Sequence, residues 1–205
     1  MDVYSNVLYV KEKHAELCNL AHRAIEIDKF RPETCMIIGN YHSSKGERES
    51  AIQSFSRALK LNPEFYPALT LMGHEYVELC NAQAAIRVYR KAVDLNSRDY
   101  RAWFGLGQAY DLLRLPSYSL HYYQRAVAIR PYDGRMWNAL GGCFESLERN
   151  PQAIKCFKRA LIGSDTVEAH YLAKLAQLYV ALGSKGAVNA LYFYKRYLAE
   201  EVHFL

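Results

Sequence analysis

Large and small hydrophobic residues recur in a fixed order along this chain, and equivalent positions lie about 34 residues apart. The pattern is clearest between residues 100 and 131, where its members are Trp103, Leu106, Gly107, Tyr110, Tyr123, Ala126 and Pro131. Matching residues follow one period later, and they precede this stretch by one and two periods. A period in this range predicts an array of helix pairs, with one pair in each unit.

Each unit has a glycine in its first predicted helix, and an aromatic residue with an alanine three positions later in its second. Glycine lowers helix propensity by about 1 kcal/mol, so we expect a neighbouring helix to pack closely against each one. The glycines are Gly39, Gly73, Gly107 and Gly141, and the aromatic residues are Phe55, Tyr89, Tyr123 and Phe157. Aromatic residue and alanine share one helix face, which a single unit cannot bury, so the units must stack.

No linker or low-complexity segment interrupts the pattern, which predicts one elongated domain over residues 1–205. Its expected units are a partial repeat at 1–31 and full repeats at 32–65, 66–99, 100–133, 134–168 and 169–205. Gly46 is expected in a turn between helices. We call the positions of Phe55, Tyr89, Tyr123 and Phe157 the aromatic seam. The last unit matches only with small shifts, which would place Tyr194 in this seam. Leu191 and Leu198 would then form part of an exposed apolar edge.

Composition excludes several classes of protein. No run approaches the roughly 18 uninterrupted apolar residues that a membrane span needs, and the first residues do not resemble a signal peptide. Five cysteines without a CxxC pair predict free thiols in a reducing compartment, and Cys80 is expected on a helix. The net charge of +5 comes largely from basic residues that repeat with the units, so we expect a solvated face and no nucleic-acid partner.

Three arrangements could carry chemistry, and each has a simpler explanation. His14, Cys18 and His22 share a helix face, but no fourth ligand is near in sequence, so no metal is expected. His74 and Glu78 could form a proton-transfer pair, although a hydrogen bond on a binding surface is the simpler interpretation. The segment GLGQAY lacks the strand and third glycine of a nucleotide loop. We therefore expect neither a cofactor nor enzymatic activity.

The order W/L, L, G, Y, then A, F/Y, A, P resembles the tetratricopeptide repeat over essentially the whole chain. This resemblance implies an all-α fold. Its repeats would form a right-handed superhelix, an α-solenoid with about five full repeats plus a partial N-terminal one.

A more particular similarity comes from the words IIGNYHS, LTLMGHEYVE, DYRAWFGLGQAYDLL and HYYQRAVAIRPYDGRMW. They resemble the C-terminal repeats of the subunit eight family of the anaphase-promoting complex, also called the cell-division-cycle protein 23 family. The resemblance implies a non-catalytic scaffold subunit of a ubiquitin ligase that controls mitotic exit, in the nucleus and cytoplasm. It also implies contacts with other subunits and a possible homodimer through repeats outside this chain.

In tetratricopeptide arrays the first helices line a concave groove, and certain positions of each unit face it. The corresponding residues here are Asn40, His74, Glu78, Arg101, Phe104, Gln108, Asp111, Arg135, Asn138 and Glu145. The resemblance implies that an arginine-containing motif of an activator protein binds there. Asp111, Glu145 and Glu78 would hold the arginine.

The other members of the set suit the rest of an extended peptide. The amides of Asn40, Asn138 and Gln108 would bind the peptide backbone, and Phe104 would receive an apolar side chain. The alternative is that these residues are only solvated helix faces.

An alternative function is a stand-alone repeat adaptor, such as a co-chaperone or a transport receptor. Chaperone-binding repeats use lysine and asparagine at two groove positions to clamp a terminal carboxylate. Here Met36 stands at the lysine position before Asn40, so such a clamp is not expected.

Overall fold

The chain is helical throughout the part that the computed structural model describes, which is residues 2–163, 169–183 and 186–202. Over these residues there are twelve helices and no strand, which confirms the all-α expectation. The helices are α1 (Asp2–Val10), α2 (His14–Asp28), α3 (Pro32–Ser44), α4 (Arg48–Leu61), α5 (Tyr66–Glu78), α6 (Ala82–Leu95), α7 (Tyr100–Leu112), α8 (Pro116–Ile129), α9 (Gly134–Ser146), α10 (Asn150–Ile162), α11 (Ala169–Ala181) and α12 (Ala187–Val202).

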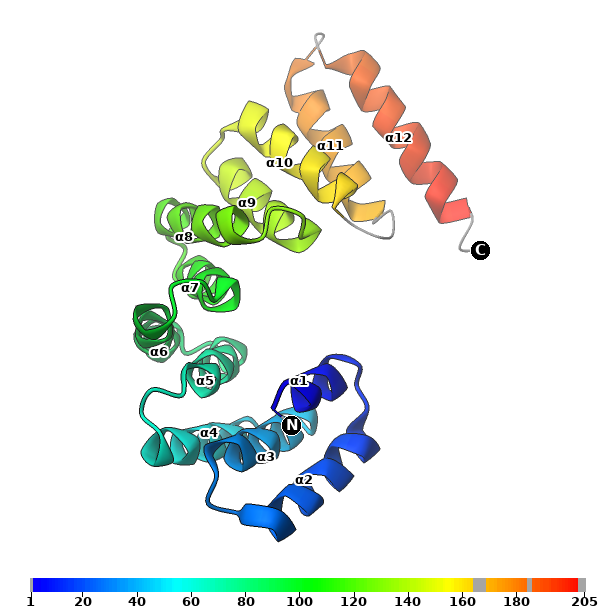
Figure 1. The fold of residues 1–205 in the computed structure, drawn as a ribbon. Helices are drawn as coiled ribbons and strands as arrows, with labels where there is room; N and C mark the ends of the chain where they lie inside the picture. The colour runs from blue at the N-terminus through cyan, green and yellow to red at the C-terminus, as the bar shows by residue number, and fades with distance from the viewer. Residues whose placement is uncertain (1, 164–168, 184–185, 203–205) are drawn as a thin grey trace. The chain divides into compact units, whose positions relative to one another are not determined.

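These helices fall into two compact units, residues 1–113 with α1 to α7 and residues 114–205 with α8 to α12. Within each unit every helix packs against the next one along the chain, as Figure 1 shows. In the first unit α1 also packs against α3, and α5 packs against α7, so first helices of neighbouring repeats touch. One continuous domain over the whole chain stays a prediction.

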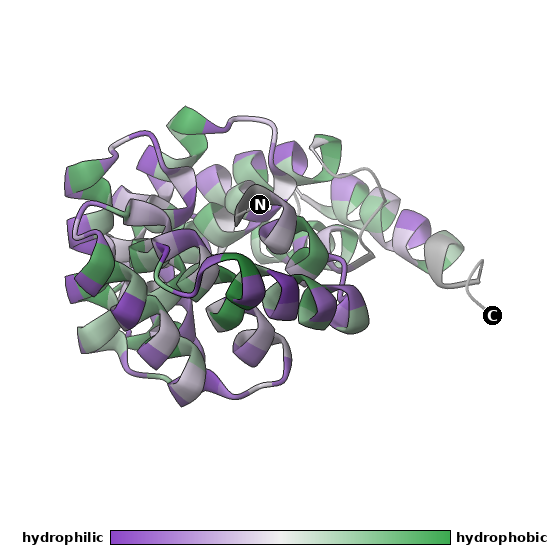
Figure 2. Cartoon of the chain, turned by 60° about the horizontal axis from the view of Figure 1, so that its bottom comes forward, coloured by the Kyte–Doolittle hydropathy of each residue, from purple (hydrophilic) through white to green (hydrophobic). Residues whose placement is uncertain are grey.

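The aromatic seam lies where the repeat pattern places it. Figure 2 shows hydrophobic and hydrophilic stretches alternating within single helices, as expected when each helix buries only one face. The seam aromatics Phe55, Tyr89, Tyr123 and Phe157 are all buried, and the alanines three positions later, Ala58, Ala92, Ala126 and Ala160, are completely so. Aromatic residue and alanine therefore do form the core of each second helix.

Three of the four predicted glycine contacts are confirmed. A Cβ atom added at Gly39 would overlap the ring of Phe55, and one added at Gly73 would lie 2.6 Å from Tyr89 Cε1. At Gly141 the ring of Phe157 would be 3.0 Å away. In each of these repeats the ring of the second helix occupies the space that the glycine leaves on the first helix.

Tyr89 is enclosed by glycines from two repeats. Besides Gly73 of its own repeat, its ring and hydroxyl approach Gly105 on α7, where an added Cβ would overlap them. Gly105 lies outside the repeat frame that the sequence analysis used. One tyrosine therefore joins α5, α6 and α7 by close packing, and this contact fixes how two neighbouring repeats stack.

The turn inside each repeat contains one residue in the left-handed backbone region. These residues are Glu12, Gly46, Cys80, Arg114, Glu148 and Gly183, with φ values of 54°, 77°, 55°, 58°, 57° and 69°. The expected turn at Gly46 is confirmed. Cys80 lies exposed in such a turn, just after α5, so its predicted place on a helix was wrong, whereas all five cysteines are free as expected.

The two ends of the array differ from the full repeats. The stretch 1–31, expected as a partial repeat, has both helices, and its first helix α1 is short, with 9 residues. The expectation for the last repeat needs correction. In the last repeat the seam position belongs to Phe193, which is buried and stacks on Tyr179 with ring centroids 5.7 Å apart, whereas Tyr194 is exposed. The shift has a physical reason, because a longer turn before α12 rotates that helix relative to the simple repeat frame.

A buried carboxylate, that of Glu75 on α5, joins three helices of the first unit. It accepts a hydrogen bond from Ser43 Oγ on α3 at 2.6 Å and one from Arg48 Nη1 on α4 at 3.1 Å. Burial alone would raise the pKa of Glu75, but hydrogen bonds from His74, Ser43 and Arg48, with the charge of Arg48, hold the pKa below its ordinary value. The contacts of Glu75 therefore favour its charged carboxylate form.

Replacing Gly105 by alanine tests the packing around Tyr89. The added methyl overlaps a ring that cannot withdraw, because Gly73 lies against it as well, so Gly105→Ala should destabilise the chain by about 1–3 kcal/mol. Gly142→Ala is the matched control, since no atom lies within 4 Å of its added Cβ and the helix should gain about 0.5–1 kcal/mol. Urea unfolding followed by circular dichroism measures both. Equal effects of the two variants would contradict the proposed contact.

The depressed pKa of Glu75 predicts a dependence of stability on pH. Because the folded-state pKa lies below the unfolded value, the charged carboxylate stabilises the fold above about pH 4.5. This contribution is lost as the pH falls through the folded-state pKa. Glu75→Gln should reduce stability at pH 7 by about 1.5–3 kcal/mol and flatten its decline below pH 4.5.

Thermal unfolding between pH 3 and 7 measures this effect, and Glu64→Gln is the control. Glu64 lies exposed in the turn before α5, so the control variant should follow the original chain at every pH. If stability declines below pH 4.5 in Glu75→Gln as it does in the original chain, carboxylates other than Glu75 cause that decline.

Candidate peptide-binding site

Four of the predicted site residues form one stripe on α7, which we call the α7 stripe: Arg101, Phe104, Gln108 and Asp111. Their spacings of three, four and three residues keep them within roughly 80° around the helix, over a length of about 15 Å. Arg101 and Asp111 are exposed, and the other two are half-buried. The stripe thus offers a cation, an aromatic ring, an amide and a carboxylate in sequence along one face.

The start of the α7 stripe is fixed by Asp99, the residue that caps α7. Its Oδ1 accepts hydrogen bonds at 3.1 Å from both the backbone N–H and Nε of Arg101. Its Oδ2 accepts from Thr70 Oγ1 on α5 at 2.8 Å. The same carboxylate therefore caps α7, orients Arg101 and ties α7 to α5.

His74 and Glu78 lie on α5, the neighbouring first helix. Both are exposed, and Glu78 Oε2 accepts a hydrogen bond from Arg48 Nη2 at 3.1 Å. His74 Nδ1 lies 3.7 Å from Glu75 Oε1. Histidine and glutamate are thus each paired with another side chain, which does not favour a proton-transfer couple between them.

Asn40 differs from the expectation, because it is 1% exposed instead of facing solvent. Its Nδ2 donates to Ser5 Oγ at 3.0 Å and to Asn6 Oδ1 at 2.8 Å, both on α1. The physical reason is the short first helix, which packs on α3 and uses this amide to hold itself in place. Asn40 is therefore a contact between repeats and is not accessible to a peptide backbone.

The second unit carries the remaining three residues, Arg135, Asn138 and Glu145, on α9. Arg135 is held by the capping Asp133, to which its Nε and Nη2 donate at 3.1 and 2.8 Å. This side-chain hydrogen bonding holds the pKa of Asp133 below its ordinary value. Asn138 is half-buried.

Glu145 is already part of an ion pair. Lys174 Nζ on α11 donates to both of its carboxylate oxygens at 3.0 Å. An arginine from a partner would have to compete with this lysine.

The structure also identifies residues that the sequence analysis did not single out. Arg48 and Lys174 lie opposite the predicted carboxylates Glu78 and Glu145, and no local sequence pattern links these pairs. For Asp99 and Asp133 a signal exists. Each stands two positions before a predicted arginine and directly before the first helix of a repeat, which is the pattern of a capping aspartate.

Other candidate chemistry is accounted for by local contacts. His22 Nδ1 lies 2.9 Å from the carbonyl oxygen of Cys18 and 3.6 Å from its sulfur, so this ring is turned toward its own helix. Within the described ranges, no three His, Cys, Asp or Glu side chains are arranged to hold a metal ion. None of the described helices combines the length and hydrophobicity that a membrane crossing requires.

Comparison with family models identifies tetratricopeptide repeats along most of the chain. One tetratricopeptide repeat model matches residues 70–134 and 116–167, and a second matches residues 32–65.

Solved structures of similar fold include the APC/C hetero-tetramer Cut9-Hcn1, with a TM-score of 0.80 at 21% identity over 94% of this chain and 38% of that one. A MamA protein gives 0.73 at 22% identity, covering 83% of this chain and 91% of that one. At these identities the similarity concerns the fold.

Sequence relatives are closer. Anaphase-promoting complex subunit 8 of Dictyostelium discoideum is 63% identical over 198 residues, which is 97% of this chain and 33% of that protein. Subunit 8 of Arabidopsis thaliana is 60% identical over 81 residues, 40% of this chain and 14% of that protein. Subunit CDC23 of Saccharomyces cerevisiae is 51% identical over 82 residues, 40% of this chain and 13% of that protein.

The chain thus spans a third or less of the length of these curated relatives. The repeat register, the helix pairs and the sequence identity to these relatives all indicate the same family. The chain belongs to the tetratricopeptide-repeat family and, within it, to the group formed by subunit 8 and CDC23 of the anaphase-promoting complex.

Proposed function

We propose that this chain is a non-catalytic scaffold segment of the anaphase-promoting complex, a ubiquitin ligase, and that it binds an arginine-containing motif of the activator on its first helices. Family membership supports the first part of the proposal. The α7 stripe supports the second. The same proposal gives the chain a role in mitotic control, in the nucleus and cytoplasm.

The single observation that carries the peptide-binding part is the order of side chains along the α7 stripe. Asp111 gives a carboxylate at the C-terminal end of α7, to which a guanidinium can donate two hydrogen bonds. Gln108 can bind a peptide group with both its amide N–H and its oxygen, and Phe104 offers an apolar contact one turn away. A short extended segment with an arginine at one end matches this order.

The three predicted carboxylates differ in their surroundings. Glu145 pairs with Lys174, and Glu78 pairs with Arg48. Asp111 is exposed at the C-terminal end of the α7 stripe. We assign the arginine to Asp111 because it follows Phe104 and Gln108 along the stripe, and we give Glu78 and Glu145 supporting roles.

The scaffold part of the proposal has its own surface, an apolar stripe on α12 formed by Val188, Leu191, Tyr194 and Leu198. All four side chains are exposed, and their spacing places them along one side of the helix. Exposed apolar stripes of this kind are typical of protein contacts. We assign this surface to a neighbouring subunit, whereas a homodimer would use repeats outside this chain.

Reversing the charge at Asp111 tests the arginine site. Asp111→Lys should weaken binding of a peptide covering the arginine-containing motif about tenfold or more, because a charge-assisted hydrogen bond is replaced by repulsion. Fluorescence anisotropy with a labelled peptide measures the affinity. A peptide with alanine in place of the arginine should bind the original chain and the variant equally weakly.

The matched control is Asp94→Lys, which makes the same charge change at an exposed position of the second helix α6. It should leave the affinity within about twofold of the original value. An equal loss of peptide affinity in both variants would show that net charge causes the effect. Unchanged affinity in Asp111→Lys would show that Asp111 is not part of the site.

Polar substitutions on α12 test the scaffold surface. The double variant Leu191→Ser and Leu198→Ser should reduce co-purification of other large subunits from cells, because it removes two exposed apolar contacts. Ile162→Ser is the control, since Ile162 is similarly exposed but lies at the end of α10. Full recovery of the other subunits with the double variant would place the subunit contact elsewhere.

A further inference from the structure

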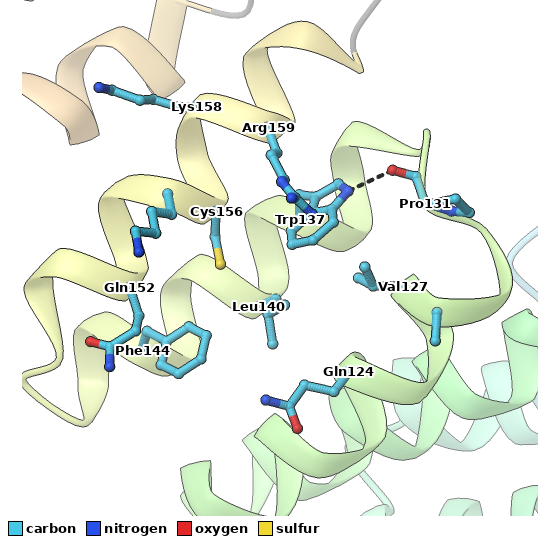
Figure 3. Close-up of a pocket in the computed structure, with 12 residues that line it drawn as sticks. Gln124, Val127, Pro131, Trp137, Leu140, Phe144, Gln152, Cys156, Lys158 and Arg159 are labelled. Carbon is cyan, nitrogen blue, oxygen red and sulfur yellow. Dashed lines mark hydrogen bonds between the residues drawn. The ribbon is translucent and has the colours of Figure 1, made fainter.

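A pocket of about 700 Å³ lies in the second unit, between α8 and α10 and over one side of α9. Figure 3 shows Trp137, Leu140 and Phe144 along its floor, Val127 and Gln124 on the α8 side, and the α10 side chains opposite. Leu140, Phe144 and Val127 are already buried apart from the atoms that line the pocket. The volume and the apolar floor are those of a site for one large side chain and its neighbours.

The rim of this pocket has one sign of charge. Lys155, Lys158 and Arg159 of α10 line it, and none of its lining residues is acidic. Over the described part of the chain none of these three cations forms an ion pair with a carboxylate. Burial raises the pKa of the lining Cys156 to about 11, so this thiol adds no negative charge at neutral pH.

Arg159 and Trp137 are held in a particular arrangement. The guanidinium carbon lies 4.5 Å from the centre of the Trp137 ring, and Trp137 Nε1 donates to the carbonyl oxygen of Pro131 at 2.7 Å. The indole N–H thus has a hydrogen-bond partner within the chain, and the Trp137 ring lines the pocket. A guanidinium held over a ring by a cation–π contact can still donate its N–H groups to a carboxylate.

The pocket uses another face of α9 than the candidate peptide site. Asn138 and Glu145 lie about 120° around the helix from Trp137, Leu140 and Phe144. The remaining walls come from α8 and α10, the second helices of their repeats. A ligand here would therefore not depend on the α7 stripe or on Asp111.

We propose that this pocket, which we call the α8–α10 pocket, binds a short acidic segment of a partner protein that carries one aromatic or large aliphatic side chain. The apolar side chain enters above Leu140 and Phe144. Carboxylates on either side of it accept hydrogen bonds from Arg159 and pair with Lys155, and Lys158, whose ammonium lies 5.5 Å from the centre of the Tyr179 ring, adds positive charge beside the rim. The apolar floor favours such a peptide over a nucleic acid, which would match only the rim.

A labelled acidic heptapeptide tests this proposal with the whole chain. Fluorescence anisotropy should detect binding of EEDFDEE with a dissociation constant below about 100 µM. EEDSDEE, which lacks the aromatic side chain, and KKRFRKK, which has the opposite charge, should each bind at least tenfold more weakly. Absence of measurable binding by EEDFDEE, or equal binding of EEDSDEE, would overturn the proposal.

Two variants locate the bound peptide. Lys155→Glu with Lys158→Glu should weaken binding at least tenfold, whereas Arg87→Glu with Lys91→Glu makes the same change of net charge on the exposed face of α6 and should change it less than twofold. Gln124→Trp should weaken binding by filling the pocket mouth with its charges intact. Equal losses in the two charge variants would overturn the proposal.

Two competitors complete the test. A single-stranded oligodeoxynucleotide of 12 nucleotides should not displace EEDFDEE at concentrations near the dissociation constant of the peptide, and the arginine-containing activator peptide should not displace it at all. Displacement by the oligonucleotide, with the same loss in Lys155→Glu and Lys158→Glu, would identify a phosphate site and overturn the peptide proposal. Displacement by the activator peptide would mean that the two sites are not separate, which also overturns it.

Discussion

Close packing of an aromatic ring into the space left by glycine joins the two helices of a repeat, and at Tyr89 it also joins two neighbouring repeats. Tyr89 shows the constraint most fully, because its ring lies against Gly73 in its own repeat and against Gly105 in the next. Such a contact leaves little free volume, so it sets how closely α5 and α7 can approach α6. The positions of the side chains on the first helices follow from this geometry.

Because the interior is filled by aromatic and aliphatic side chains packed against alanine and glycine, polar groups inside the array need specific partners. Glu75 and Asp99 are both buried, and each joins helices of neighbouring repeats through hydrogen bonds to charged or hydroxyl groups. A buried carboxylate without such partners would be strongly destabilising. These two residues therefore add directional contacts to a core that is otherwise held by packing alone.

The sequence predicted the parts of the fold that depend on periodic packing, and it failed where a residue's environment depends on a distant element. Phe55 and Tyr89 could be placed in the seam because the spacing of large and small residues is a property of the chain itself. Asn40 could not be placed, since its burial depends on how α1 packs against α3. Tyr194 was misplaced because a change in turn length moved the seam to Phe193. The pocket on α8 to α10 had no signal, because its residues match ordinary repeat positions.

The left-handed residues in the turns have a consequence for how such a chain diverges. Glu12, Cys80 and Glu148 adopt the same left-handed backbone as Gly46, at a cost of roughly 1–2 kcal/mol relative to glycine. The fold thus accommodates residues other than glycine at this corner, each at that cost. Glycine is consequently a poor guide to repeat boundaries in distant homologues, which are better located by the aromatic residues of the second helices.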